Sequence, residues 1–232
     1  MNLKQLAAEK AVEYVKDGMR IGLGTGSTAY WAIRKIGERV REGLSIQAVA
    51  TSKASEKLAL EQGIPLIPFN RLEGLDLTID GADELDRGLH LIKGGGGALL
   101  REKIVAYHSK ELIVIANESK LVDKLGRFPL PVEIVPFANE WTLASLEGMG
   151  AKPMLRTEDE HIYVTDNGNY IADCRFGFIE DPEKLHRLLL ALPGVVDNGL
   201  FIGLAARAVI GHSDGNVTVI EREASLGVKD LN

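Results

Sequence analysis

One stretch of the sequence, residues 80–102, combines several carboxylates, a lysine and four consecutive glycines. Its candidate reactive side chains are Asp80, Asp83, Lys93 and Glu102. Carboxylates can move protons, a lysine can stabilise developing negative charge, and glycines leave backbone N–H groups open to a ligand. We interpret the combination as an active site. For either part alone, an Asp-Gly turn or a flexible glycine loop would be an equally good interpretation.

The residues on the N-terminal side predict how the first carboxylates are held. The apolar run 75–79 predicts a buried strand of a parallel sheet, and Asp80 follows at its end. Gly81 and Ala82 are expected to form a tight turn that presents Asp83. Both carboxylates would then lie at the carboxyl end of one strand.

The residues on the C-terminal side predict a strand and a helix. A short strand at 89–92 leads to Lys93, and the glycines at 94–97 follow with no side chains at all. A helix is expected to begin at Ala98, which brings Glu102 into its first turns. The amino end of a helix favours an anion, so this segment suits a negatively charged ligand or intermediate.

A second glycine-rich segment, Gly-Thr-Gly-Ser-Thr-Ala at 24–29, lies between a predicted strand at 19–23 and a predicted helix at 30–40. This arrangement cradles phosphate with backbone N–H groups and hydroxyls. The segment also matches a dinucleotide fingerprint, which needs an acidic residue after the second strand. That strand, at 45–50, is followed by Thr-Ser-Lys, and a Walker loop would need a lysine before the Ser-Thr pair. A monophosphate site and a purely structural turn both stay open.

The remainder of the first half alternates helices and strands. Apolar spacing predicts helices at 3–15 and 55–62 and a fully apolar strand at 111–116, with Lys4 off the apolar stripe of the first helix. Such alternation, with polar residues at strand ends, indicates a doubly wound α/β fold with a mostly parallel sheet. Lys120 lies just beyond a strand end, where a lysine is normally solvated unless the ligand is anionic.

The pattern changes at 128–131, where two prolines interrupt regular structure. The rest predicts a smaller α+β domain of the ferredoxin-like, split βαβ kind, with 165–169 as a hairpin loop. Its predicted elements are strands at 132–135, 152–156, 161–165, 169–174 and 194–200, and helices at 138–148 and 182–191. We divide the chain into an α/β catalytic domain, residues 1–130 plus 201–232, and a small α+β domain, residues 131–200.

Composition limits the class of protein. The 232 residues are 45% hydrophobic and 26% charged, with a net charge of -6. This charge argues against nucleic acid as a partner, so an anionic ligand would need a local positive potential. The single cysteine, Cys174, indicates a reducing compartment, and the scattered histidines offer no metal-ligand spacing. With no apolar run of membrane-spanning length and no signal peptide, we expect a cytoplasmic protein without metal, cofactor or membrane partner.

Proton transfer is the chemistry that these groups support. If a phosphorylated sugar binds its phosphate at 25–28, its other end reaches the carboxylates and the lysine. Aldose to ketose isomerisation needs only a base that removes a proton beside the carbonyl, and donors that stabilise the enediolate. We expect Glu102 to be the base and Lys93, with the glycine amides, to stabilise the enediolate. Asp80 and Asp83 would shuttle a proton between the sugar oxygens.

Several of these motifs together closely resemble ribose-5-phosphate isomerase, type A. They are Gly-Thr-Gly-Ser-Thr-Ala (24–29), Asp-Gly-Ala-Asp-Glu (80–84), Lys-Gly-Gly-Gly-Gly-Ala-Leu-Leu-Arg-Glu-Lys (93–103), Phe-Pro-Leu-Pro-Val-Glu (128–133), Thr-Asp-Asn-Gly-Asn (165–169) and Pro-Gly-Val-Val (193–196). The resemblance covers nearly the whole chain. It implies a cofactor-free enzyme of the pentose phosphate pathway that interconverts ribose 5-phosphate and ribulose 5-phosphate, as a homodimer or homotetramer.

The resemblance also implies a role for individual residues. Glu102 would accept the proton, and Lys4 matches a phosphate-contacting lysine near the N-terminus of the family. The implied substrate-binding residues are Thr25, Gly26, Ser27, Thr28, Asp80, Gly81, Ala82, Asp83, Lys93, Gly94, Gly95, Gly96 and Lys120.

Two other classes compete with an isomerase. A sugar-phosphate sensor could share a related α/β fold, but it would normally carry a DNA-binding region and would not need Glu102. A coenzyme A transferase-like enzyme would need a nucleophilic glutamate at a strand end and a nucleotide pocket. Turnover of ribose 5-phosphate separates these alternatives.

Overall fold

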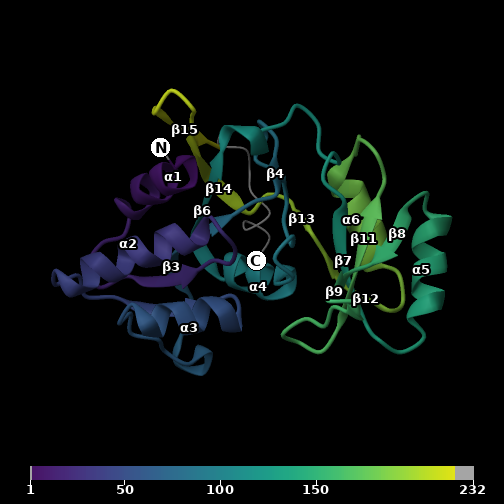
Figure 1. The fold of residues 1–232 in the computed structure, drawn as a ribbon, viewed down its shortest axis with the longest axis horizontal. Coiled ribbons are helices and arrows are strands. Elements are labelled where there is room, and N and C mark those ends of the chain that lie inside the picture. Colours follow the sequence, from purple (N-terminus) through teal and green to yellow (C-terminus); the bar gives the residue numbers. More distant parts are fainter. Residues whose placement is uncertain (1, 223–232) are drawn as a thin grey trace.

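The structure, a computed structural model that describes residues 2–222, is built around a six-stranded sheet (Figure 1). Its strands lie in the order β15-β14-β6-β3-β1-β2, and every neighbouring pair is parallel except β14 and β15. They are β1 (Arg20–Leu23), β2 (Gln47–Ala50), β3 (Leu75–Gly81), β6 (Ser109–Asn117), β14 (Ala205–Gly211) and β15 (Val217–Glu221). Residues 205–221 therefore return to the sheet that the first half of the chain builds.

Helices cover both faces of this sheet. They are α1 (Leu3–Val12), α2 (Ala29–Arg41), α3 (Lys53–Glu61) and α4 (Leu99–Tyr107). Side chains alternate along β6, so Ile113 and Ile115 pack with α1 and α2, whereas Leu112 and Val114 pack on the face of α4. A strand that is buried on both faces must be continuously apolar, which explains the sequence of β6.

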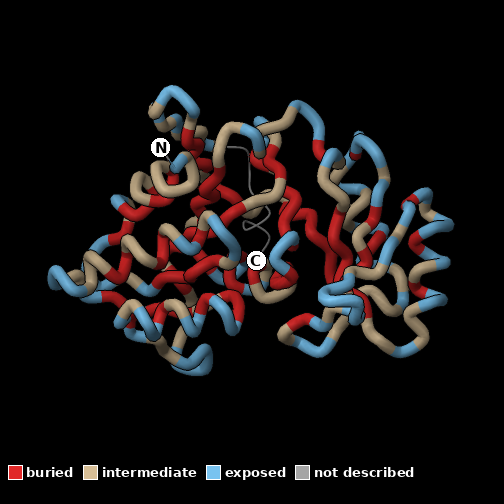
Figure 2. Tube along the Cα trace, viewed as in Figure 1, coloured by how far each residue is buried: buried red, intermediate tan, exposed pale blue. Residues whose placement is uncertain are grey.

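A second, four-stranded antiparallel sheet has the order β12-β7-β11-β8. Its elements in chain order are β7 (Leu130–Ile134), α5 (Asn139–Gly148), β8 (Lys152–Leu155), β11 (Tyr170–Arg175), α6 (Pro182–Leu190) and β12 (Val195–Asn198). This βαββαβ order, with the first and third strands in the centre, is the split βαβ arrangement. The predicted fold class is therefore confirmed, and Figure 2 shows buried segments in both sheets.

Short elements complete the structure. They are the strands β4 (Glu84–Leu85), β5 (Leu91–Ile92) and β13 (Leu200–Phe201), which form a three-stranded sheet, the hairpin β9 (Thr157–Glu158) with β10 (His161–Ile162), and the 3-10 helices η1 (Phe69–Arg71) and η2 (Glu118–Lys120). Within residues 2–222, no helix is both long and apolar enough to cross a membrane.

Three local predictions were wrong. The tight turn at 81–82 is absent, because β3 continues through Gly81, which pairs with Ile115 of β6. The strand predicted at 194–200 divides into β12 and β13, which belong to different sheets. The segment 165–169 does not join two paired strands, because β10 pairs with β9 rather than with β11. Predictions for residues 223–232 lie outside the described residues.

Shortening a side chain should destabilise the six-stranded sheet more in its central strand β6 than in its edge strand β15. Ile115→Ala removes a fully buried side chain, so the free energy of unfolding should fall by about 2–5 kcal/mol. Ile220→Ala, on the half-buried edge strand β15, is the matched control and should lower the free energy of unfolding clearly less. Urea unfolding of both variants measures the difference, and equal losses would contradict the central position of β6.

Candidate active site

A cavity of about 300 Å³ lies where β1 and β3 end and the glycine-rich segments begin. Its lining residues are Lys4, Thr25, Gly26, Ser27, Thr28, Gly81, Ala82, Asp83, Lys93, Gly94, Gly95, Gly96, Glu102 and Lys120. Carboxyl ends of parallel strands are where open α/β sheets bind ligands. The structure thus brings together every residue that the sequence predicted for the site, except that Asp80 lies beneath the cavity rather than in its wall.

The ammonium group of Lys93 is the buried centre of this site. Its side chain is 3% exposed, and Nζ donates to the Gly81 carbonyl oxygen at 2.5 Å and lies 3.1 Å from one oxygen each of Asp80 and Glu102. Burial alone lowers the pKa of Lys93, but the two carboxylates outweigh burial, so the net pKa is raised. Lys93 therefore stays charged and provides a fixed cation beside the cavity.

The carboxyl group of Glu102 lies in the first turn of α4 and is almost fully buried. Burial and the nearby charge of Asp80 raise its pKa to about 8, although Lys93 opposes part of this shift. Oε1 accepts from Lys93, whereas Oε2 has no hydrogen-bond partner within the described part of the chain. A carboxylate with one uncommitted oxygen and a raised pKa is well suited to accept a proton.

Asp80 and Asp83 occupy different environments. Asp80 is 1% exposed, and its Oδ1 accepts the backbone N–H groups of Thr25 and Gly81 at 3.0 and 2.7 Å. Asp83 lines the cavity and accepts the N–H of Gly95 at 2.7 Å. Asp80 therefore connects Lys93 to the loop after β1, while Asp83 is the carboxylate that a ligand can reach.

Two glycines of the segment after Lys93 are required by its geometry. Gly94 has a φ of +106°, a conformation that disfavours any side chain. A Cβ on Gly95 would lie 2.5 Å from Oδ1 of Asp83, so this residue has to be glycine for the N–H to reach the carboxylate. The turn thus holds bare backbone against the cavity.

The opposite end of the cavity suits a phosphate. Ser27 and Thr28 precede the first residue of α2, and among the described residues 2–222 the side chain of Thr28 makes no capping hydrogen bond. Nζ of Lys4 donates to Oγ of Ser27 at 2.8 Å, which brings a cation from α1 to this loop. A helix amino end, hydroxyls and a lysine together make an anion site. The hydroxyl of Thr25 does not belong to this anion site, because it is hydrogen-bonded to the hydroxyls of Thr51, Ser52 and Ser55.

Comparison with known proteins agrees with this geometry. A family model described as ribose 5-phosphate isomerase A (phosphoriboisomerase A) matches residues 47–215. The chain is 57% identical to ribose-5-phosphate isomerase A of Bacillus mycoides, across 93% of this chain and 98% of the relative. It is 53% identical to that of Parvibaculum lavamentivorans, across 91% and 95%. The chain belongs to the ribose 5-phosphate isomerase A family. The family resemblance predicted from its sequence motifs is therefore confirmed.

Solved structures of this family have the same fold. One of them, D-ribose-5-phosphate isomerase in complex with phospho-erythronic acid, matches with a TM-score of 0.92 and 39% identity over 96% of this chain and all of that chain. Ribose 5-phosphate isomerase A from Methanocaldococcus jannaschii matches with a TM-score of 0.89 and 42% identity, over 94% and 97%.

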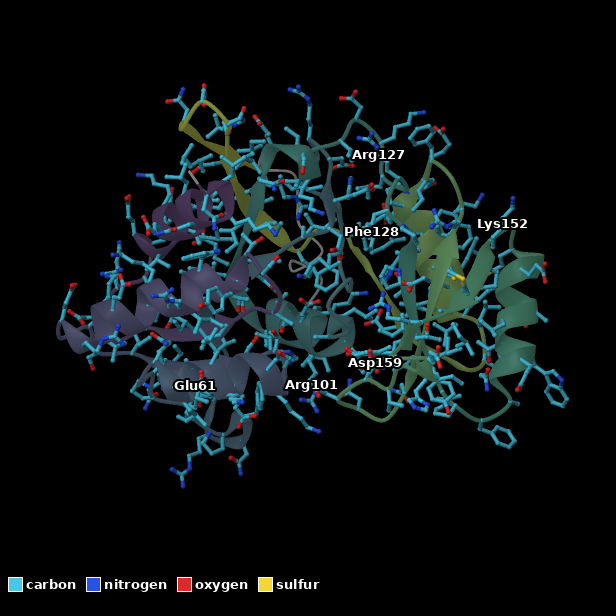
Figure 3. All side chains as sticks on the ribbon, in the orientation of Figure 1. Glu61, Arg101, Arg127, Phe128, Lys152 and Asp159 are labelled. Atoms are coloured by element: carbon cyan, nitrogen blue, oxygen red, sulfur yellow. The ribbon has the colours of Figure 1, made fainter. Side chains whose placement is uncertain are left out.

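Sequence reasoning missed the contribution of the second sheet to this isomerase-family site. Arg156, just after β8, donates from one nitrogen to the carbonyl oxygens of Gly94 and Gly95. Arg101 on α4, labelled in Figure 3, donates to the Asp166 carbonyl at 2.9 Å and to the side chain of Asn167 at 2.8 Å. No spacing rule predicts contacts between sheets, although the Thr-Asp-Asn-Gly-Asn motif did mark the loop.

The carboxyl group of Glu102 should titrate far above the usual range for glutamate. Because its pKa is raised to about 8, the group is protonated below that pH and ionised above it. Infrared difference spectra across pH 8 should contain the band of a protonated carboxyl that disappears as pH rises, and Glu102→Gln should remove that band. A Glu102 band that titrates near the usual value would contradict the buried site described here.

Proposed function

We propose that this chain interconverts D-ribose 5-phosphate and D-ribulose 5-phosphate through an enediolate. The observation that carries the proposal is the pairing of Glu102 with the buried cation of Lys93, in the wall of a cavity whose other end suits phosphate. Relatives with more than half of their residues identical are named for this activity. One solved relative holds phospho-erythronic acid, a phosphate ester that carries a carboxylate at its other end.

In this reaction Glu102 takes the proton from C2 of the open-chain aldose. The electrons of the broken C–H bond form the C1–C2 double bond, and the carbonyl oxygen becomes an enediolate oxygen. The hydroxyl proton on O2 passes to O1, and return of the proton from Glu102 to C1 then gives the ketose, so no electron is exchanged with a second molecule. The step needs a positioned base and donors for the oxygen, and it needs neither metal nor redox cofactor.

The remaining roles follow from the environments of the groups. The cation of Lys93 and the N–H of Gly96 stabilise the enediolate oxygens, because both are fixed before the charge develops, whereas the N–H of Gly95 holds Asp83. Asp83 moves the hydroxyl proton between the two oxygens, since it is the carboxylate of the pair that lines the cavity. Asp80 instead orients Lys93 and residues 24–28, which we call the phosphate loop. These assignments favour Asp83 over Asp80 as the proton shuttle.

The other expectations for this chain are part of the same proposal. A cytoplasmic enzyme of the pentose phosphate pathway, working as a homodimer or homotetramer without nucleic-acid or membrane partners, fits the family. The division into residues 1–130 plus 201–232 and residues 131–200 fits the two cores, one beneath α1 and α2 and one within the four-stranded sheet. A sugar-phosphate sensor would have no use for a buried base such as Glu102.

The decisive experiment is turnover by purified wild-type protein and by Glu102→Gln. Ribose 5-phosphate in the presence of excess chelator should give ribulose 5-phosphate, with exchange of the C2 proton into deuterated solvent. Gln retains the size of Glu but accepts no proton from carbon, so kcat should fall about 10²- to 10⁴-fold. Substrate binding by the variant is the control for an intact site.

Two outcomes would refute this assignment. Wild-type protein that binds the sugar phosphate without turnover would be a sensor. A Glu102→Gln protein with more than about a tenth of wild-type kcat would move the base to Asp83.

The phosphate loop should control binding rather than chemistry. Ser27→Ala combined with Thr28→Ala removes two hydroxyls from the proposed phosphate site, and the phosphate is bound alike in substrate and transition state. KM should therefore rise at least about tenfold while kcat changes little. Exposed Thr157→Ala, on β9, is the control. A collapse of kcat at constant KM would assign the loop to the chemistry instead.

A further inference from the structure

The glycine turn at 94–97 is held from outside the cavity by one guanidinium group. Arg156 lies just after β8, its side chain is 15% exposed, and NH1 donates to the carbonyl oxygens of Gly94 and Gly95 at 2.9 and 3.1 Å. Asp173 on β11 binds the other edge of the guanidinium with both carboxylate oxygens, at 3.0 and 2.6 Å. Such a two-pronged pair fixes the plane of the guanidinium.

The same peptide units carry N–H groups on the cavity side. The peptide between Gly94 and Gly95 presents its carbonyl to Arg156 and its N–H to Asp83, at 2.7 Å. In a trans peptide the C=O and N–H bonds point in opposite directions. The next peptide therefore directs the N–H of Gly96 away from Arg156, and Gly96 lines the cavity. One cation thus fixes two peptide planes whose donors lie at the site.

We propose that Arg156 is a positioning residue for the isomerisation and acts through the backbone of Gly94, Gly95 and Gly96 in the glycine turn. The inference rests on the proposed function and names a residue of the four-stranded sheet that serves it. The guanidinium holds both peptide planes and draws electron density toward their oxygens. This makes the Gly95 N–H a stronger donor to Asp83 and the Gly96 N–H a stronger donor to an enediolate. Tyr163 supports the same contact, since the guanidinium lies over its ring at 5.8 Å and its hydroxyl packs against Gly97.

The alternative is that Arg156 merely fastens the second sheet to the first. A fastening residue would change stability and leave the chemistry of the folded enzyme unchanged. A positioning residue would lower kcat and weaken binding of a ligand that presents oxygens to the turn, with little effect on phosphate alone. The two patterns differ in the ratio between the affinity for such a ligand and the affinity for inorganic phosphate. Partial loss of folded protein does not alter this ratio.

The experiment compares Arg156→Gln, Arg156→Lys and Asp173→Asn with wild type. Arg175→Gln, on the same strand as Asp173 and exposed, is the matched control. The measurements are kcat and KM for ribose 5-phosphate, the dissociation constants of phospho-erythronic acid and of inorganic phosphate, and the urea midpoint. Wild-type turnover separately tests the proposed function.

In Arg156→Gln, kcat should fall about 10- to 100-fold, which is less than the loss of a direct oxyanion donor. Affinity for phospho-erythronic acid should fall by a similar factor, whereas that for inorganic phosphate should change less than about twofold. Arg156→Lys should restore only part of kcat, because an ammonium cannot bind Asp173 and two carbonyls at once. Asp173→Asn should show an intermediate loss, and Arg175→Gln should resemble wild type.

The inference is overturned if folded Arg156→Gln keeps kcat within about twofold of wild type. Equal losses of affinity for the two probes would also overturn it, since they would indicate a general distortion. If Arg156→Gln does not fold, Arg156→Lys and Asp173→Asn decide by the same ratio of affinities. That ratio can be measured even if wild-type protein does not turn over ribose 5-phosphate, so the two proposals can fail independently.

Discussion

The buried ammonium of Lys93 is the interaction on which the site depends. An unpaired charge at this depth would be very costly, and removal of one partner from a buried pair costs about 3–5 kcal/mol. Lys93 therefore needs Asp80, Glu102 and the Gly81 carbonyl together. Asp80 in turn accepts the backbone N–H of Thr25 in the loop after β1. One buried cation thus fixes the position of Glu102 relative to the loop after β1, which forms the other end of the cavity.

The elements around Lys93 meet because parallel strands end at one edge of the sheet. β1 delivers the phosphate loop and β3 delivers Asp80, while α4 brings Glu102 back over the same edge. The four-stranded sheet closes this arrangement from the other side. Arg156 binds the glycine turn, and the loop 165–169 binds Arg101, the neighbour of Glu102. Rigid elements therefore support the reactive groups on both sides.

The sequence predicted what depends on local pattern and missed what depends on packing between distant segments. The glycine turn, the helix that carries Glu102 and the strand before Asp80 all follow from periodicity and turn chemistry. Nothing local indicates that β3 continues through Gly81, since a strand extends as far as its neighbour β6 pairs with it. The presence of Lys4 at the site was suggested only by family resemblance, and nothing suggested that of Arg156. Both residues contact segments that lie far from them in the chain.

The raised pKa of Glu102 sets two opposing effects against each other. Because its pKa is raised to about 8, the ionised carboxylate is the minority form at pH 7. The same burial makes the ionised form a stronger acceptor of a proton from carbon, because basicity rises with pKa. A dianionic phosphate close to Glu102 would raise its pKa further and withdraw the ionised form. The proposed phosphate site at the far end of the cavity avoids this effect, because Lys4 and the amino end of α2 would offset the phosphate charge there. On the proposed assignment, the separation of the two ends of the cavity keeps Glu102 available as a base.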